Sequence, residues 1–340
     1  MSHGITNSDS LFTVRKPAWH GLGTVLEEYP ASVEDALEKS GLGWEVEKRD
    51  LYVAAPPTFD GTGLYVPQVE SDIVSAPDWK ANVRSDTNKT LGIVGKDYSV
   101  VQNREAFAWL EALLGEELEW ETAGSINEGR RVWVLAKIPE GVEIGGDATE
   151  SYIYCANSHD GSMAVTAAAT GIRIVCQNTL NFALNRSERN AQRTYKFRHT
   201  GNMTAKLDEA RRVMEVSRDW TKALKELGDE LAREFITTDR FDEKVVKPLF
   251  GLREGEVEDL SDRAKTNREE ARSKVLSIFR GDGPDGDTRG NSGQSKWTAL
   301  NAVGEYADHY RRTTKSTNQV ARSFEDTRLK QAGLELVTRA

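Results

Sequence analysis

The stretch YCANSHDGSMAVTAAATGIRIVCQNTL, residues 154–180, decides how the fold is interpreted. The apolar runs SYIYCA (151–156) and SMAVTAAAT (162–170) are typical of strands. Between them lies NSHDG, and its Asp-Gly pair is a strong hairpin signal because glycine accepts positive φ. We therefore expect an antiparallel hairpin with His159 and Asp160 at its tip. The sheet should continue through IRIVC and then turn into a helix near NTLNFALNR, where Asn178 or Thr179 can act as the cap.

Other segments of the first 200 residues alternate between strand and helix signals. WEVEKRDLYVAA (44–55) and RRVWVLAKIP (130–139) are rich in β-branched and aromatic residues and predict strands. SVEDALEKSG (32–41) and NREAFAWLEALLG (103–115) predict helices, because each begins with a capping residue, Ser32 or Asn103, and stops at a glycine. We therefore expect an α+β protein in which a mixed, largely antiparallel sheet core carries packed helices.

The character of the chain changes after residue 200. Apolar residues recur at steps of three and four over residues 203–235, which predicts a long helix that packs on the sheet or on a copy of itself. More helices are expected near 262–280 and 296–312, separated by GDGPDGDTRGNSGQS (281–295), a segment with almost nothing to bury. The expected organisation is a sheet core at 1–200, a helical region at 201–280, a flexible loop at 281–295 and C-terminal helices at 296–340.

The charge of the chain is distributed unevenly. Residues 173–212 hold nine basic and three acidic residues, although the net charge of all 340 residues is −9. Within this stretch, RSERNAQRTYKFRH (186–199) interleaves cations with aromatic rings. Its basic residues are Arg186, Arg189, Arg193, Lys196 and Arg198, and its aromatic residues are Tyr195 and Phe197. Cations neutralise phosphates and aromatic faces stack on unpaired bases, so the segment predicts a site for single-stranded nucleic acid.

A simpler interpretation of the same segment stays open. A basic run between a strand and a helix is commonly a solvated loop. It can also pair with an acidic segment of the same molecule, and REGEVEDLSD (253–262) offers one. Neither alternative requires a nucleic-acid partner.

Metal and catalytic sites are less well supported by the sequence. Cys155, His159, Cys176 and His199 are acceptable zinc ligands, but their spacing matches no compact zinc pattern. We expect instead that His159 is a turn residue with a solvated ring and that both cysteines face the core. His20, in AWHGLGT, has no nucleophile signature beside it, and Glu116 and Glu117 are typical of a solvated helix face. We therefore predict no metal, no cofactor and no catalytic residue.

Six ordered motifs resemble a known family. They are AWHGLGT (18–24), YSVVQNREAF (98–107), GRRVWVLAKIP (129–139), NSHDGSMAV (157–165), RIVCQNTL (173–180) and NAVGEYADHY (301–310). Together they are similar to a phage- and plasmid-borne family known as domain of unknown function 932, in the branch named for its L-G-T motif. The setting of that family in mobile elements implies DNA processing in recombination or replication. By analogy of fold, its core is similar to single-strand annealing proteins of the Rad-fifty-two type.

The resemblance implies a protein that holds single strands for pairing and breaks no bond. We accordingly expect a homo-oligomer in the cytoplasm, which is the host cytoplasm if a phage encodes the chain. No apolar run approaches the length of a membrane span, and the N-terminus lacks the order of a signal peptide, so no membrane association is expected. Two further functions stay open: a non-catalytic interaction or assembly factor of a phage, and an enzyme of unknown reaction.

Overall fold

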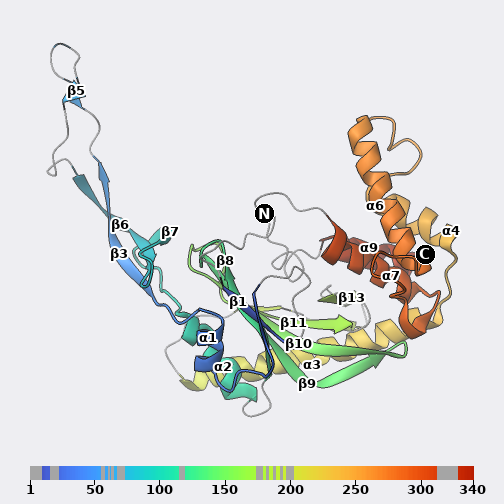
Figure 1. Cartoon of the computed structure of the whole chain (residues 1–340), viewed down its shortest axis with the longest axis horizontal. Coiled ribbons are helices and arrows are strands. Elements are labelled where there is room, and N and C mark those ends of the chain that lie inside the picture. The colour runs from blue at the N-terminus through green and yellow to red at the C-terminus, as the bar shows by residue number, and fades with distance from the viewer. Residues whose placement is uncertain are drawn as a thin grey trace.

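An eight-stranded, mostly antiparallel sheet forms the body of the protein (Figure 1). The computed structural model describes residues 10–15, 23–54, 58–59, 62, 65–66, 73–114, 119–173, 179–180, 184–186, 189–191, 194–196, 203–311 and 328–340. Four consecutive strands make an antiparallel meander at the centre of the sheet: β8 (Glu119–Ile126), β9 (Arg131–Ile144), β10 (Asp147–Ser158) and β11 (Thr166–Arg173).

Short strands complete both sides of this meander. On one side, β1 (Leu11–Val14) pairs antiparallel with β8 and parallel with β2 (Thr24–Leu26). On the other side, β12 (Thr179–Leu180) and β15 (Thr194–Lys196) both pair with β11. The sheet is therefore mixed and largely antiparallel, as the sequence predicted.

A second, three-stranded sheet stands out from the body as a ribbon (Figure 1). It consists of β3 (Val46–Ala54), β6 (Ile73–Arg84) and β7 (Thr90–Gly95), in the order β3-β6-β7. We call residues 45–54 and 73–97 the ribbon. Near its far end lies a small strand pair, β4 (Thr58–Phe59) with β5 (Tyr65–Val66).

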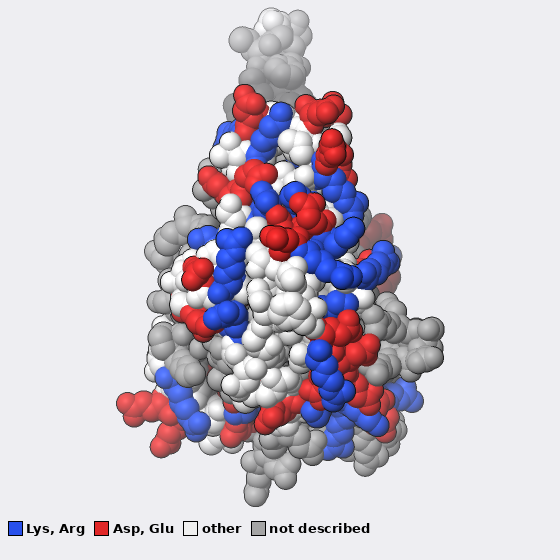
Figure 2. Space-filling view, turned by 90° about the vertical axis from the view of Figure 1, so that its right-hand side faces the viewer, with Lys and Arg blue, Asp and Glu red and all other residues white. Residues whose placement is uncertain are grey.

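The C-terminal region is helical and has a core of its own. Trp220 of helix α3 (Met203–Arg233) is buried there with Trp297 and Phe279. The other elements are α4 (Thr238–Phe241), the π-helical segment η3 (Asp242–Val246), α5 (Lys247–Phe250), α6 (Asp262–Arg280), the short 3-10 segment η4 (Gly290–Ser292), α7 (Lys296–Glu305), the π-helical segment η5 (Tyr306–Tyr310) and α9 (Arg328–Arg339). Figure 2 shows basic and acidic side chains interleaved on the face of the molecule that presents these helices. Among the described helices, none combines the length and apolar character needed to cross a membrane.

One buried and one partly buried ion pair link elements of this helical region. Lys330 of α9 lies 2.6 Å from the carboxylate of Asp308 in η5, and both side chains are almost fully buried. Arg272 of α6 forms two hydrogen bonds with the carboxylate of Asp242 in η3. Each pair joins a π-helical segment to a different helix, so the ion pairs fix how the helices pack.

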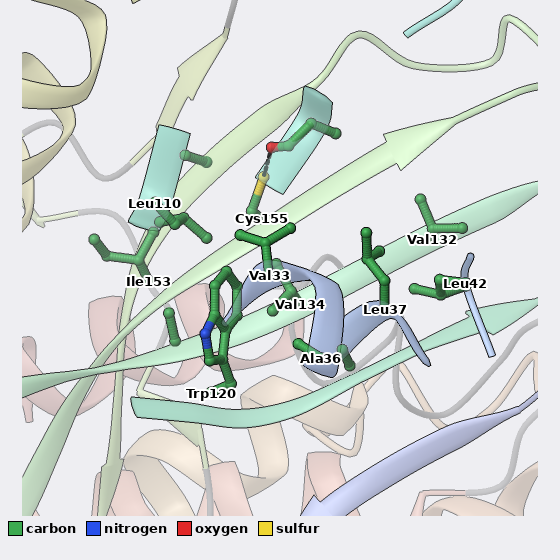
Figure 3. Packing of buried hydrophobic residues seen from close by; sticks show 14 of the residues in the cluster. Val33, Ala36, Leu37, Leu42, Leu110, Trp120, Val132, Val134, Ile153 and Cys155 are labelled. Atoms are coloured by element: carbon green, nitrogen blue, oxygen red, sulfur yellow. Dashed lines mark hydrogen bonds between the residues drawn. The ribbon is translucent and has the colours of Figure 1, made fainter. Parts of the chain in front are cut away.

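Helices α1 (Val33–Lys39), α2 (Asn103–Leu114) and α3 cover one face of the large sheet. Figure 3 shows Val33, Ala36 and Leu37 of α1 among side chains of the sheet. Val134 and Ile153 come from β9 and β10 and are fully buried in this cluster. The amphipathic face predicted for residues 203–235 thus packs on the sheet and on the C-terminal core.

Most predicted elements are confirmed, including helix α1 with its Ser32 cap and helix α6 at 262–280. The helix expected near NTLNFALNR is wrong: Thr179–Leu180 forms β12 and Leu184–Arg186 forms β13. The free edge of β11 and the strand β14 (Arg189–Ala191) supply backbone partners to these residues, and this pairing overrides a helical pattern.

The loop expected at 281–295 has specific contacts with the sheet. The backbone N–H of Asn291 donates to the carboxylate of Asp147 at 2.8 Å, and Ser292 Oγ donates to the carbonyl of Gly145 at 2.9 Å. Gly145 lies in the turn between β9 and β10, and Asp147 is the first residue of β10. The mobility of this segment stays a prediction.

Candidate nucleic-acid interface and a carboxylate cluster

Part of the basic segment predicted to bind nucleic acid belongs to a β-hairpin, in which β13 pairs with β14. In the pairing of β13 with β14, Arg186 lies directly opposite Arg189. The chain then returns to the sheet as β15, which contains Tyr195 and Lys196. The remaining predicted residues, Arg193, Phe197 and Arg198, lie outside the described residues.

Helix α3 lies against this hairpin. Strands β13, β14 and β15 all contact α3, which begins at Met203. Arg212 of α3 is exposed. The described parts of the stretch with nine basic residues, strands β13, β14 and β15, therefore all lie against α3.

The register of β15 separates two of the predicted residues. Lys196 pairs with Thr166, which pairs with Ala156, so these three residues form one row across the sheet. Tyr195 stands in the next row, with Ala167 and Cys155. The register therefore places Lys196 and Tyr195 in neighbouring rows of the sheet.

The acidic segment 253–262 lies between α5 and α6 in the helical region. Its contacts include bonds within the segment or to α6: Glu256 accepts a hydrogen bond from the backbone N–H of Arg253, and Ser261 caps α6. These bonds give the segment a local role in starting α6. Whether it also pairs with residues 186–199 stays a prediction.

The tip of the β10–β11 hairpin at His159, Asp160 and Gly161, which we call the His159 corner, differs from what the sequence predicted. The hairpin between β10 and β11 is confirmed, and Gly161 has a φ of +75°. However, the prediction of a solvated ring is wrong, because His159 is only 1% exposed. Its Nε2 lies 2.8 Å from Asn103 Oδ1, and its ring packs edge-on against Trp44 at 5.3 Å. Burial lowers the pKa of His159 to about 4.

Asn103 was predicted to cap α2 and does not. It is the first residue of the helix and is 1% exposed. Its Nδ2 donates to the carbonyl of Leu42 at 2.9 Å, and its Oδ1 faces His159. The Asn103 side chain therefore bonds to Leu42 and His159 and does not cap the N-terminus of α2.

The corner fastens the ribbon to the body of the protein. Asn82 of β6 donates to the carbonyl of His159 at 2.8 Å, and the Arg84 guanidinium lies 4.4 Å from the ring of Trp44. Arg84 also pairs with Asp86, and this hydrogen bond holds the pKa of Asp86 below its usual range. The polar groups of the corner thus bind parts of the chain to one another, which assigns the corner a structural role.

The zinc site considered from the sequence has no support at the residues described. His159 Nε2 is engaged by Asn103, and Cys155 Sγ points to the carbonyl of Ala106 at 3.7 Å, as the dashed line in Figure 3 shows. Cys155 is fully buried in the core, as predicted. Cys176 and His199 lie outside the described residues, and within the described ranges no three His, Cys, Asp or Glu side chains are grouped to hold a metal ion.

A second polar site, not foreseen from the sequence, lies on strands β8, β9 and β10. We call it the carboxylate cluster, and it consists of Tyr29, Glu119, Glu121, Lys137, Glu150 and Tyr152. Lys137 Nζ lies 2.9 Å from Glu150 and 3.5 Å from Glu119. Tyr152 donates to Glu150 at 2.5 Å, and Tyr29 makes a longer bond of 3.4 Å to Glu121.

Two β-bulges build this cluster. The register of β8 shifts between Trp120 and Thr122, and that of β10 shifts between Thr149 and Ser151. Each bulge contains one glutamate, Glu121 or Glu150. Bulges re-aim side chains and interrupt the alternation of a strand. Sequence periodicity therefore gives no signal for this site, since only the pairing reveals the bulges.

The electrostatics of the cluster favour bound protons over bound phosphates. Burial, followed by repulsion from Glu150, raises the pKa of Glu121. Burial and the Glu121 charge also raise the pKa of Tyr29 to about 12. A carboxyl group with a raised pKa beside tyrosines can hold or exchange a proton. Because three carboxylates surround one lysine, a nucleic-acid backbone is not expected to approach this part of the sheet.

Comparison with known proteins gives one result. The family model described as Domain of unknown function (DUF932) matches residues 90–332, which cover most of the chain. This span includes the meander, the basic segment and most of the helical region. No curated protein and no solved structure matches the chain.

Proposed function

We propose that this chain, which belongs to the family described as Domain of unknown function (DUF932), binds single-stranded nucleic acid and acts in phage or plasmid DNA processing. The work is of the annealing type: a strand is held extended for pairing with its complement during recombination or replication, and no bond is broken. Such work requires no cofactor.

One observation carries the proposal: Arg186 lies opposite Arg189 in a hairpin next to α3 with its exposed Arg212. Clustered guanidinium groups bind phosphates, and release of the condensed counterions drives the binding. The same neighbourhood contains Lys196 and, in the adjoining sequence, Arg193 and Arg198. This concentration of positive charge in an acidic chain favours a polyanion as the partner.

Aromatic residues of the same segment support single strands over duplexes. Tyr195 and Phe197 stand among the basic residues, and aromatic faces stack on bases that are not paired. Tyr195 lies in β15 and Phe197 lies outside the described residues, and both are candidates for stacking. A duplex offers phosphates to the arginines but no free base face, so it should bind less tightly.

The test is fluorescence anisotropy with labelled single-stranded and double-stranded oligonucleotides of equal length, over a salt series from about 50 to about 200 mM. We expect micromolar or tighter binding to the single strand, weaker binding to the duplex and a steep loss of affinity with salt. An oligonucleotide without bases, made of abasic sites, is the control for stacking. Absence of binding at the lowest salt overturns the proposal.

A second function, a non-catalytic assembly factor, is favoured by a different observation. Six large apolar side chains of the ribbon are about half exposed or more. Exposed apolar groups of this kind mark protein interaction surfaces rather than nucleic-acid sites.

A further inference from the structure

The ribbon exposes apolar side chains that nothing in the described structure covers. Of the large hydrophobic residues that are exposed in the described residues, most lie here. They are Tyr52 (55% exposed), Val53 (50%), Ile73 (56%), Val74 (56%), Trp79 (53%) and Ile93 (54%). Scattered exposed residues are normal, but a concentration on one protruding element indicates a contact surface.

The register places these residues on both faces of the ribbon. Val53 lies directly opposite Val74, so the two valines share one face. Tyr52 and Ile73 occupy neighbouring rows and belong to the other face. In the inner half, Trp79 pairs with Gly95 and Ile93 pairs with Ala81, so Trp79 and Ile93 share a face. The ribbon can therefore make apolar contacts on either side.

The outer half of the ribbon has only two strands among the described residues. Strand β7 pairs with β6 from Trp79 inward, whereas Tyr52–Ala54 pair with Ile73–Ser75 alone. A two-stranded ribbon is marginally stable in water, and its outer edges present unpaired backbone groups. An association that covers its faces and edges would stabilise it.

The neutral net charge of the ribbon favours a second copy of this chain as its binding partner. The ribbon contains six acidic and six basic residues and is neutral, whereas the whole chain has a net charge of −9. Four of its six cations form ion pairs with carboxylates of the ribbon: Arg49 with Glu47, Lys80 with Asp50, Arg84 with Asp86 and Lys96 with Asp78. Such a surface neither attracts a polyanion nor repels a copy of itself. Elsewhere, two copies of this acidic chain would repel each other.

We infer that the ribbon associates with the ribbon of a second copy of this chain. The contact is two-fold symmetric, because the same apolar and neutral surface is present on both copies. Val53 and Val74 of one copy pack against the same residues of the other, and Trp79 and Ile93 form a second apolar contact closer to the body. This inference is independent of the proposed nucleic-acid function, because no residue of the ribbon belongs to the basic segment 186–199.

The test is the molar mass of the full chain by light scattering and by sedimentation, over a wide concentration range without nucleic acid. We expect a reversible, concentration-dependent dimer for the parent. The double variant Val53→Lys/Val74→Lys should be a monomer, because charges would then face each other across the two-fold axis. Trp79→Lys changes a second position of the ribbon and should also weaken the dimer. If both variants dissociate, a local distortion at Val53 and Val74 is not the cause.

Phe235→Lys is the matched control. Phe235 is 67% exposed but lies after α3, away from the ribbon, so its replacement should leave the mass unchanged. Unfolding curves of all variants should match that of the parent. A parent that is monomeric throughout, or a Val53→Lys/Val74→Lys protein that keeps the mass of the parent, overturns the inference. If a monomeric ribbon variant still binds single-stranded nucleic acid, the proposed function does not depend on the dimer.

Discussion

His159 and Asn103 form a buried hydrogen bond of 2.8 Å between the tip of the β10–β11 hairpin and the first turn of α2. Its direction follows from the partners of Asn103. Because Asn103 Nδ2 donates to the carbonyl of Leu42, its Oδ1 is the acceptor and His159 Nε2 is the donor. A neutral imidazole can fill this role, and burial keeps the ring neutral at physiological pH.

The first prediction concerns the pH dependence of stability. Burial lowers the pKa of His159 to about 4, below the value of about 6.5 in an unfolded chain. The folded protein therefore binds fewer protons between these values, and the free energy of unfolding should fall as the pH is lowered through this window. The loss attributable to His159 is up to about 3 kcal/mol, from about 1.4 kcal/mol per pKa unit. Denaturant unfolding at several pH values measures it.

His159→Gln is the variant that isolates this effect. Its side-chain amide can donate to Asn103 and does not titrate, so the variant should lose stability less steeply between pH 6.5 and pH 4 than the parent. His159→Ala should cost about 1–3 kcal/mol at neutral pH, because Asn103 Oδ1 would remain buried without a donor. An equal pH dependence in His159→Gln and the parent would show that other groups control acid unfolding.

The second prediction compares two glycines of β7. A Cβ added at Gly92 would lie 2.5 Å from Asp160 Cα, whereas one at Gly95 would meet nothing within 4 Å. Gly92→Ala should therefore force the ribbon away from the hairpin tip and destabilise the protein by about 1–3 kcal/mol, as overpacking does. Gly95→Ala should be nearly neutral or stabilising. Thermal unfolding distinguishes the two variants, and equal melting temperatures would contradict a tight contact at Gly92.

Local sequence signals predicted the elements better than their contacts. The Asp-Gly pair correctly predicted the hairpin and the positive φ of Gly161, and Ser32 correctly predicted the start of α1. The burial of His159 could not be predicted, because Trp44 and Asn103 are distant in sequence and no periodicity links them to it. The strands β12 and β13 were missed for a similar reason, since β11 and β14 provide their partners.

The third prediction concerns Glu121 of the carboxylate cluster. Burial and the Glu150 charge raise its pKa, so the folded state holds a proton on Glu121 more firmly than the unfolded state does. Stability from this group is present at low pH and is lost as the pH rises through the folded-state pKa. Glu121→Gln removes the charge and keeps an acceptor for Tyr29. It should raise the melting temperature at neutral and alkaline pH, with a gain that shrinks toward acid.

Glu119→Gln is the control for the cluster. Its side chain is 41% exposed and it makes the longer of the two contacts to Lys137, at 3.5 Å. Removing its charge should change the melting temperature little at any pH. If Glu121→Gln were destabilising at neutral pH, the prediction would be wrong, because the attraction of the ionised carboxylate to Lys137 would then outweigh its burial and its repulsion from Glu150.

The last prediction tests the hairpin arginines as phosphate contacts. Arg186→Ala/Arg189→Ala removes two charges of the hairpin but leaves its backbone intact. Each lost phosphate contact should shallow the plot of log affinity against log salt by about 0.7 for a single strand, so the slope should fall by up to about 1.4. Lys244→Ala/Arg263→Ala removes two exposed cations from the helical region and should leave the slope unchanged. Phe197→Ala should instead weaken binding by about 1–3 kcal/mol at an unchanged slope, as loss of a stacked base does. If the hairpin variant keeps the slope of the parent and the helical variant loses it, the nucleic-acid surface lies on the C-terminal helices and the hairpin assignment is wrong.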